Sequence, residues 1–500
     1  MKKRCLAIAL CFLLLPALTG CVSDLLVEKE STGDTLPDVR PGPSAPVGDS
    51  QSDRRVSAVL YLPDAELTRL TAQDRTVSVE AGDSLEKAVV DALLAEINAS
   101  DFRPGQSVSL APVSNAVEVT RDLVTVNLGT SARALGSEAL FALRMAITNT
   151  LTTLTDINYV NILINGRDPG LDVRMLLPTG VLSRYPSTDI SAQLTQVSVQ
   201  RSATDGELQK TVALYFPSED GEMLLGEVRD VTFSSRDLAL YAQVLLEELQ
   251  IGPLQSGMRA IVPPQDYFER SPSLTVVNGT DRYMEIYLRE ETDDYLLLNG
   301  GTRAQLLGSI CYTLTSFIPE LEGIVAYIGG ETVTSLTLAD GSTWSSPTGR
   351  LTRETFASFA ADMCTVYFPL ADGTGLRAVQ RPIAQNQRTQ PRALLRELMD
   401  PPSDPSFSPA LPQSVSDADI LGLQITSDTA LVNLSDAFAA ACAGMTAQQE
   451  RDMIYAIVNT LTELGGVARV RLYVDGVQSQ LAGHLFIGGE FLRHTGLIRP

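Results

Sequence analysis

Apolar residues follow helix and strand spacings in three successive stretches of this chain. In the first stretch Leu85, Val89 and Leu93 fall on one stripe at helical spacing, which predicts an amphipathic helix. In the third, residues 469–474 alternate between Arg or Tyr and the aliphatic residues Val and Leu, which is typical of a strand with one face in water. Each stretch predicts the same order of elements: a strand, a helix, a hairpin-like pair of strands, a second helix and a closing strand.

Two short sequence markers return in the same order in all three stretches, which indicates an internal repeat. The first marker is Tyr-x-Pro at the end of a strand, at Tyr61, Tyr215 and Tyr367. The second is Thr-Leu-Thr late in a helical pattern, beginning at Thr150, Thr313 and Thr460. A tight turn follows each second marker, at Asn165-Gly166, Gly329-Gly330 and Asp475-Gly476. Such dipeptides supply the positive φ angles of a type I′ hairpin, so each repeat is expected to end in a strand that doubles back.

The element order predicts an α+β fold of three tandem β-α-β-β-α-β modules, each a small sheet with two helices packed on one face. We expect the modules at residues 55–178, 209–338 and 362–500. Segments rich in Ser, Thr, Pro and Gly are expected to be linkers between them, at residues 179–208 and 339–361. The modules are therefore expected to be separate beads, and the third is expected to fold alone.

The start of the chain has the features of an export signal. An apolar run at residues 6–18 follows three basic residues and is too short to span a bilayer, so residues 1–20 are expected to be a cleaved signal peptide. Cys21 follows Leu18-Thr19-Gly20, the pattern of a lipobox, which predicts lipid attachment to the Cys21 thiol. The alternative is an ordinary secretory signal with a cysteine near its cleavage site. Residues 21–54, rich in Pro, Gly and Ser, are expected to be a flexible stalk.

Charge and residue counts exclude several classes of function. With 38 basic and 60 acidic residues, the net charge of −22 has the wrong sign for a nucleic-acid partner, and membrane attachment is expected through the lipid on Cys21. With His484 and His494 as the only histidines, neither a metal site nor a cofactor is expected. Three further cysteines are expected to be buried hydrophobic residues and not disulfides, namely Cys311, Cys364 and Cys442.

The third stretch resembles a GerMN domain, the sporulation and spore germination domain. The resemblance rests on Tyr367-Phe368-Pro369, Leu431-Val432-Asn433-Leu434-Ser435 and Ala456-Ile457-Val458-Asn459-Thr460-Leu461-Thr462. The first stretch is similar through Val126-Asn127-Leu128 and Asn149-Thr150-Leu151-Thr152. The second stretch departs from the pattern, because Tyr312 stands where the others have Asn149 and Asn459.

The resemblance implies a lipoprotein with three GerMN repeats, held on the extracytoplasmic face of the cell membrane of a sporulating or other Gram-positive bacterium. It implies modules similar to the ring-building folds of the channel between mother cell and forespore. It also implies a role in sporulation, spore germination or cell-envelope assembly, with envelope or sporulation proteins as partners, ring-forming ones included. The family supplies no active site that transfers to this sequence.

The recurring aspartates are the strongest candidates for chemistry in the chain. Asp64, Asp220 and Asp372 follow the first strand of each repeat and could form a calcium or substrate site, but the chemistry of tight turns explains them more simply. Ser84 and Lys87 spell the Ser-x-x-Lys motif of penicillin-binding proteins without its companion motifs. They are expected to begin a helix.

Polar residues late in the second helix are expected to have structural roles. Asn149 and Asn459 could contact a ligand, but we expect them to tie the helix end to a neighbouring strand. The paired threonines beside them are expected to bond carbonyl groups one turn back. Since the repeats share no general base for neutral pH, neither a catalytic residue nor an enzyme activity is expected.

Two classes of function remain open. The first is a non-catalytic scaffold or assembly lipoprotein that binds other envelope proteins. The second is a protein that binds cell-wall glycan, such as peptidoglycan, or another exported ligand. An exposed row of aromatic side chains would favour glycan, but the single tryptophan, Trp344, lies in a predicted linker. The scaffold is therefore the leading expectation.

Overall fold

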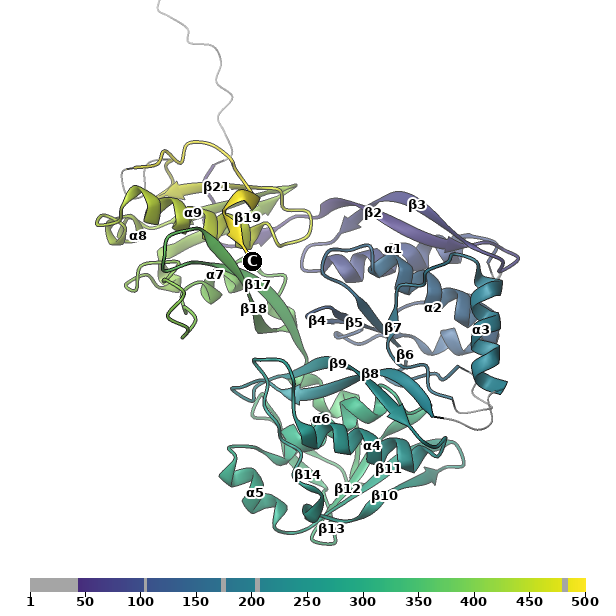
Figure 1. Ribbon diagram of the computed structural model, residues 1–500. Helices are drawn as coiled ribbons and strands as arrows, with labels where there is room; N and C mark the ends of the chain where they lie inside the picture. Colours follow the sequence, from purple (N-terminus) through teal and green to yellow (C-terminus); the bar gives the residue numbers. More distant parts are fainter. Residues whose placement is uncertain (1–43, 103–105, 172–176, 203–206, 479–483) are drawn as a thin grey trace, which may run out of the picture. The chain divides into compact units, whose positions relative to one another are not determined.

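Each of the three predicted modules opens with a long antiparallel hairpin (Figure 1). The hairpins pair β2 (Arg54–Pro63) with β3 (Leu70–Val79), β8 (Leu208–Pro217) with β9 (Leu224–Phe233), and β17 (Ala361–Pro369) with β18 (Leu376–Ala384). The predicted order has one strand at this place, so the second strand is a correction. Only Leu70, Val77 and Val79 are buried along β3, which therefore carries little hydrophobic signal in the sequence.

The computed structural model describes residues 44–102, 106–171, 177–202, 207–478 and 484–500. The signal peptide, Cys21 and most of the predicted stalk lie outside the described residues. Residues Ala45–Pro500 form one compact unit. In the described part of the chain, no helix has both the length and the apolar character needed to cross a membrane.

Two main helices follow each hairpin. The first helices are α1 (Leu85–Ala99), α4 (Leu238–Ile251) and α7 (Pro391–Glu397), and the second are α2 (Ser137–Leu151), α6 (Arg303–Thr315) and α9 (Ala447–Leu461). Two short helices, α5 (Thr292–Leu298) and α8 (Asp436–Ala441), precede α6 and α9. Side-chain caps begin several of them: Ser84 accepts from the Lys87 N–H, and Thr302 and Thr446 form capping boxes.

The second helix of each module lies between the hairpin and a mixed sheet. α2 packs on β2 and β6 (Tyr159–Ile164), α6 on β8 and β12 (Leu321–Ile328), and α9 on β17 and β21 (Arg469–Val474). Because neighbours cover it on both sides, α6 is buried at every position after Arg303.

The mixed sheets share one topology. Their orders are β4-β5-β6-β7, then β10-β11-β12-β13 with β16 also on β12, then β1-β19-β20-β21-β22. The first contains β4 (Val117–Thr120), β5 (Leu123–Leu128), β6 (Tyr159–Ile164) and β7 (Leu182–Ser183). The second contains β10 (Phe268–Val277), β11 (Asp281–Leu288), β12 (Leu321–Ile328), β13 (Glu331–Thr332) and β16 (Arg350–Thr352). The third contains β1 (Ser50–Gln51), β19 (Ile420–Thr426), β20 (Thr429–Leu434), β21 (Arg469–Val474) and β22 (Phe491–Leu492).

In each sheet the strands before and after the second helix pair in parallel, β5 with β6, β11 with β12 and β20 with β21. Parallel neighbours need a crossover connection, which the second helix supplies. The predicted α+β class is confirmed, with the element order β-β-α-β-β-α-β in each module.

The predicted tight turns are present after β6, β12 and β21. Both residues of each turn have positive φ: Asn165 52° and Gly166 78°, Gly329 57° and Gly330 80°, Asp475 46° and Gly476 83°. The chain then doubles back as predicted, through β13 in the second module and through single bridges, Ile164 to Arg167 and Val474 to Val477, in the others.

Both segments predicted as linkers contain secondary structure. The first, at residues 179–208, holds β7 and α3 (Ile190–Ser202). The second holds β16 and β15 (Thr343–Ser345), which pairs with β14 (Ser335–Thr337) and places the half-buried Trp344 against the second module. Their Ser, Thr and Gly content resembles a loop, but partner strands and core contacts order them.

The predicted stalk also ends earlier than expected. β1 pairs in parallel with β19, and the Ser52 N–H donates to the Ile425 carbonyl at 3.0 Å. The N-terminal segment therefore completes the sheet of the third module. At the other end of the chain, β23 (Ile498–Arg499) pairs with β18 of the same module.

Each module has its own hydrophobic core, but the cores share residues at the junctions. Leu123 of the first module and both Ala361 and Met363 of β17 pack into the second core. The three free cysteines, Cys311, Cys364 and Cys442, are buried as predicted. Burial raises the pKa of the Cys311 and Cys364 thiols to about 12 and that of Cys442 to about 11, so all three are neutral.

Candidate functional site

The two sequence markers of each module meet in one buried hydrogen bond. The backbone N–H of the marker tyrosine donates to the hydroxyl oxygen of the first marker threonine. The pairs are Tyr61 and Thr150 at 2.9 Å, Tyr215 and Thr313 at 3.0 Å, and Tyr367 and Thr460 at 3.2 Å. This bond fastens the hairpin to the second helix, which explains why both markers recur together.

The neighbouring polar residues have the predicted structural roles. The second marker threonine donates to a carbonyl one turn back: Thr152 to Thr148 at 2.8 Å, Thr315 to Cys311 at 2.7 Å and Thr462 to Asn459 at 3.0 Å. The Asn149 and Asn459 side chains each accept an N–H from the chain beyond the sheet, Tyr185 and His494, at 2.9 Å. Both asparagines tie the helix as expected, but to the segment just after a short strand and not to the strand itself.

A third recurring contact was missed from the sequence. An arginine lies over the ring of each marker tyrosine, within the range of a cation–π interaction. The distances from guanidinium carbon to ring centre are 5.5 Å for Arg184 and Tyr61, 5.4 Å for Arg353 and Tyr215, and 5.2 Å for Arg493 and Tyr367. Each arginine directly follows a short strand late in its module, β7, β16 or β22. A leucine one or two positions earlier, at Leu182, Leu351 and Leu492, was the available signal.

The second module uses its arginine to reach the first. Arg353 lies 3.8 Å from the centre of the Tyr312 ring and donates to the Tyr312 carbonyl at 3.1 Å and to the Ser316 hydroxyl at 2.9 Å. Its other nitrogen lies 3.4 Å from a carboxylate oxygen of Glu118 on β4. Tyr312 thus replaces the asparagine of the other modules with an aromatic surface for Arg353.

A second set of buried polar contacts joins the first and third modules. Arg388 makes two hydrogen bonds to the Glu86 carboxylate, at 2.8 and 2.9 Å. Asp362 at the start of β17 accepts the Val119 N–H at 2.7 Å, and the Gln385 amide donates to the Val117 carbonyl at 2.8 Å. These contacts occupy backbone groups along β4, the edge strand of the first sheet.

Burial changes the protonation of this junction. It raises the pKa of Asp362 to about 7, against the charge of Arg388, and the carboxylates of Glu86 and Glu118 add to the rise. Burial also raises the pKa of Glu118 despite the Arg353 charge. For Glu86 burial opposes ionisation, but the charge and hydrogen bonds of Arg388 hold its pKa below the usual range.

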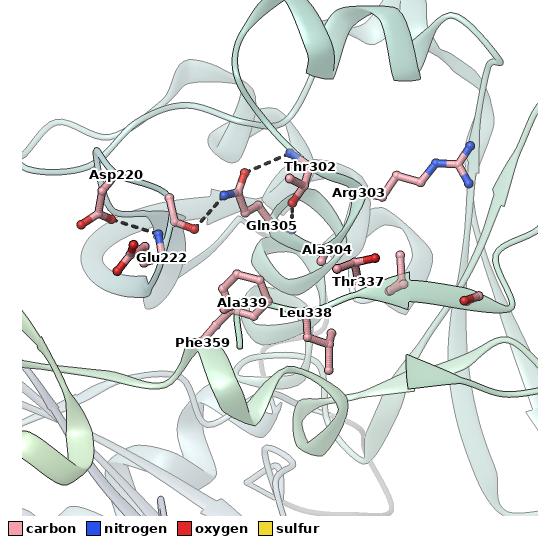
Figure 2. A pocket seen from close by; sticks show the side chains of 13 residues that line it. Asp220, Glu222, Thr302, Arg303, Ala304, Gln305, Thr337, Leu338, Ala339 and Phe359 are labelled. Atoms are coloured by element: carbon pink, nitrogen blue, oxygen red, sulfur yellow. Dashed lines mark hydrogen bonds between the residues drawn. The ribbon is translucent and has the colours of Figure 1, made fainter. Parts of the chain in front are cut away.

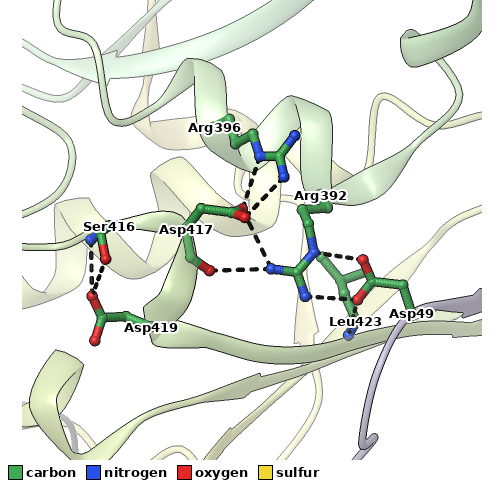
Figure 3. A network of polar contacts seen from close by, with 7 residues as sticks. All are labelled: Asp49, Arg392, Arg396, Ser416, Asp417, Asp419 and Leu423. Carbon is green, nitrogen blue, oxygen red and sulfur yellow. Dashed lines mark hydrogen bonds and ion pairs between the residues drawn. The ribbon is translucent and has the colours of Figure 1, made fainter.

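Ion pairs between arginine and aspartate side chains hold the N-terminal segment on the third module (Figure 3). Arg392 donates to both carboxylate oxygens of Asp49, at 2.8 Å to Oδ1, and the same Oδ1 also accepts the Leu423 N–H at 3.0 Å. Arg392 and Arg396 both also bind Asp417. A Cβ atom at Gly422 would lie 2.5 Å from the Pro46 carbonyl oxygen, so the segment can approach β19 only because this residue is glycine.

One surface hollow of about 540 Å³ lies in the second module, between the β8–β9 turn, the start of α6 and β14 (Figure 2). Its polar groups mostly bind one another. Asp220 accepts the Glu222 N–H at 2.9 Å, and the Gln305 amide donates to the Gly221 carbonyl at 2.7 Å. Neither histidine nor cysteine is among the described residues that line the hollow.

The three candidate aspartates lie in separate turns and are not brought together. Asp64 accepts the Thr68 N–H at 2.6 Å, and Asp372 accepts the Thr374 N–H at 2.9 Å. These bonds confirm the simpler explanation by turn chemistry. The hydrogen bonds from Thr374 also lower the pKa of Asp372, so it is ionised at neutral pH.

The remaining candidates are also accounted for. Ser84 caps α1, and Lys87 pairs with Asp83 at 2.8 Å and with Asp91 at 3.0 Å, so Ser-x-x-Lys begins a helix as predicted. Across the residues that the structure describes, no group of three or more His, Cys, Asp or Glu side chains could hold a metal ion. The lipid site predicted at Cys21 lies outside those residues.

The first and third modules match the sequence model of the Germane family, described as sporulation and spore germination, at residues 59–169 and 365–480. Both segments are therefore similar to Germane domains. The middle module lies outside the matched residues, although its element order and marker contacts are those of the two matched modules.

Two solved structures are similar to parts of the chain. The tandem GerMN domains of the sporulation protein GerM from Bacillus subtilis are 17% identical and cover 57% of this chain and 98% of that chain, with a TM-score of 0.23. A protein from Clostridium perfringens, described as a candidate lipoprotein, is 24% identical and covers 26% of this chain and 87% of that chain, with a TM-score of 0.19. No curated protein matches the chain.

Proposed function

We propose that this protein is a lipid-anchored scaffold on the extracytoplasmic face of the cell membrane, which binds other envelope proteins during sporulation, spore germination or envelope assembly. The two segments that match the Germane family support the biological process. The proposed anchor is the lipid on Cys21, and the proposed partners are other sporulation or envelope proteins. The middle module is proposed to be a third, divergent repeat of the same kind.

The observation that carries the scaffold proposal is that the recurring tyrosines, threonines and arginines are used in packing within each module. The marker tyrosines, threonines and arginines bind one another inside each module. The buried charges at Glu86, Glu118 and Asp362 bind across modules. Since these groups are engaged in packing, we propose that the protein acts by non-covalent binding and not by catalysis.

Crosslinking in intact sporulating cells tests the proposal. A photoreactive amino acid is placed at Leu298, which is 85% exposed on α5, and in a second strain at Ser78, which is exposed on β3. Crosslinks to defined envelope proteins, identified by mass spectrometry, are the expected result. The contrary result is purified protein that turns over peptidoglycan or a peptide and loses that activity in Asp372→Asn.

One observation bears on binding of cell-wall glycan. Tyr287 and Tyr327 stack on the second sheet with ring centres 5.0 Å apart, and Arg270 covers Tyr287 at 3.6 Å. Tyr287 is only 6% exposed whereas Tyr327 is half-buried, so a sugar ring would contact Tyr327. Sedimentation with purified peptidoglycan compares the intact protein with Tyr327→Ala, and a selective loss of binding would favour glycan over a protein partner.

A further inference from the structure

Three buried carboxyl groups and two guanidinium groups, one buried and one partly exposed, lie where the first module meets the other two. The carboxyl groups belong to Glu86, Glu118 and Asp362, whose residues are 7%, 6% and 3% exposed. The guanidinium groups belong to Arg353 and Arg388. If every group is ionised, one negative charge is left without a partner in a buried place, which is costly.

The contacts show which of the three acids carries the unpaired negative charge. Arg388 gives both of its short hydrogen bonds to Glu86, and Arg353 lies 3.4 Å from Glu118. Asp362 is left with Arg388 at 3.8 Å and with one neutral donor, the Val119 N–H at 2.7 Å. Asp362 is therefore the least compensated of the three acids.

Charged side chains from three parts of the fold act on the Asp362 carboxyl. Glu86 comes from α1, Glu118 from β4 and Arg388 from the turn before α7, and these are the charges that act on the Asp362 carboxyl. Arg353, from the segment after β16, acts through Glu118. On β17 itself Cys364 is a neutral thiol, because burial raises its pKa to about 12.

We propose that the junction between the first and third modules is a proton-controlled latch, closed while the Asp362 carboxyl holds a proton and weakened when that proton leaves. The hydrogen bond from the Val119 N–H to Asp362 joins the two modules directly, so its presence shows whether the latch is closed. Opening would expose the edge of β4, including the Val119 N–H and the Val117 carbonyl.

The direction of the pH effect follows from the two states. In the closed junction burial raises the pKa of Asp362 from 3.8 to about 7. Closing is thus favoured most at low pH. This stabilisation of the closed junction is lost as the pH rises through the Asp362 pKa of about 7 in the closed state. A tenfold change per pKa unit gives a loss of roughly thirtyfold in the closed-to-open ratio between about pH 5.5 and 8.5.

Hydrogen exchange of the full mature chain, followed by mass spectrometry, tests the latch. The readout is protection of the Val119 amide at the two pH values, corrected for the intrinsic exchange rate. We expect protection to fall by roughly thirtyfold in the intact protein. Asp362→Asn keeps the acceptor oxygen but cannot ionise, so its protection should be high and nearly independent of pH.

Two further variants complete the test. Glu118→Gln removes one of the acids that raise the pKa of Asp362, so the loss of protection should move to lower pH. Asp372→Asn, in an exposed turn of the same module, should leave the pH dependence unchanged. The latch is refuted if Val119 protection in the intact protein is the same at both pH values, or if Asp362→Asn or Glu118→Gln retains the full original dependence.

Discussion

The guanidinium of Arg353 lies 3.8 Å from the centre of the Tyr312 ring, at the helix position where the first and third modules carry Asn149 and Asn459. In those modules the asparagine ties the helix to the chain beyond the sheet. In the second module Arg353 makes this tie through the Tyr312 carbonyl and the Ser316 hydroxyl. With tyrosine in place of asparagine, the helix of the second module is held by Arg353. The same arginine also contacts Glu118 of the first module.

Replacing Tyr312 with asparagine should not restore the arrangement of the other modules. The variant loses a buried ring that packs edge-on against Tyr215 at 5.2 Å and lies under Arg353, so the free energy of unfolding should fall by about 3 kcal/mol. Urea denaturation measures it. Tyr312→Phe is the control and should cost less than about 1 kcal/mol, because among the described residues the hydroxyl has no hydrogen-bond partner. Equal losses in both variants would contradict the explanation.

The bond between the two markers can be tested in the third module. Thr460→Val keeps the side-chain shape but leaves the buried Tyr367 N–H without an acceptor, which should cost about 1–3 kcal/mol. Thr462→Val, two residues away, removes only a bond to a helix carbonyl and should cost less than about 1 kcal/mol. Thermal or urea unfolding of both variants gives the comparison, and a larger loss at Thr462 would show that the marker bond matters little.

The buried pair between Arg388 and Glu86 should be far more sensitive than an exposed pair nearby. Arg388→Met leaves the Glu86 carboxylate buried without its partner, and should lower the free energy of unfolding by about 3 kcal/mol. Arg396→Met breaks a pair with Asp417 whose side chains are 52% and 42% exposed, and should cost about 0–1 kcal/mol. Chemical denaturation at fixed pH measures both. Similar small losses would mean that the first and third modules do not meet through Arg388.

Displacement of the N-terminal segment from β19 should follow Gly422→Ala. The added methyl group would meet the Pro46 carbonyl oxygen and the Gly48 nitrogen, at 2.5 and 2.7 Å. We expect faster cleavage by proteinase K at residues 45–53, mapped by mass spectrometry. Gly444→Ala is the matched control, since nothing lies within 4 Å of its added Cβ. Unchanged cleavage in Gly422→Ala would indicate that the segment is not held on β19.

The proposed membrane anchor depends on one residue. Cys21→Ser should leave an unprocessed precursor that incorporates no labelled fatty acid, because the thiol that would carry the lipid is absent. Metabolic labelling and a mass measurement of the purified protein check this. Ser23→Ala, two residues further on, should be processed and labelled normally. Normal labelling of the Cys21 variant would remove the anchor from the proposed function.

Short-range sequence patterns were sufficient for the elements whose causes are local. The helical stripe at Leu85 and Val89, the glycine-containing turns and the threonine that bonds a carbonyl one turn back each depend on neighbours within a few positions, and the structure agrees with them. The α+β class followed from their order. The weakly apolar strand β3 escaped, because hairpin pairing and not hydrophobic periodicity makes it a strand.

The junctions were decided by tertiary structure alone. Arg388 and Glu86 are 302 positions apart in the sequence, and Asp362 and Val119 are 243 positions apart. Nothing in the local sequence around either acid distinguishes a buried partner from an exposed one. The same holds for β1, whose composition is that of a stalk until β19 supplies its hydrogen bonds. By itself the sequence determined what each module is made of, whereas long-range pairing of charges and strand edges decided how one module binds the next.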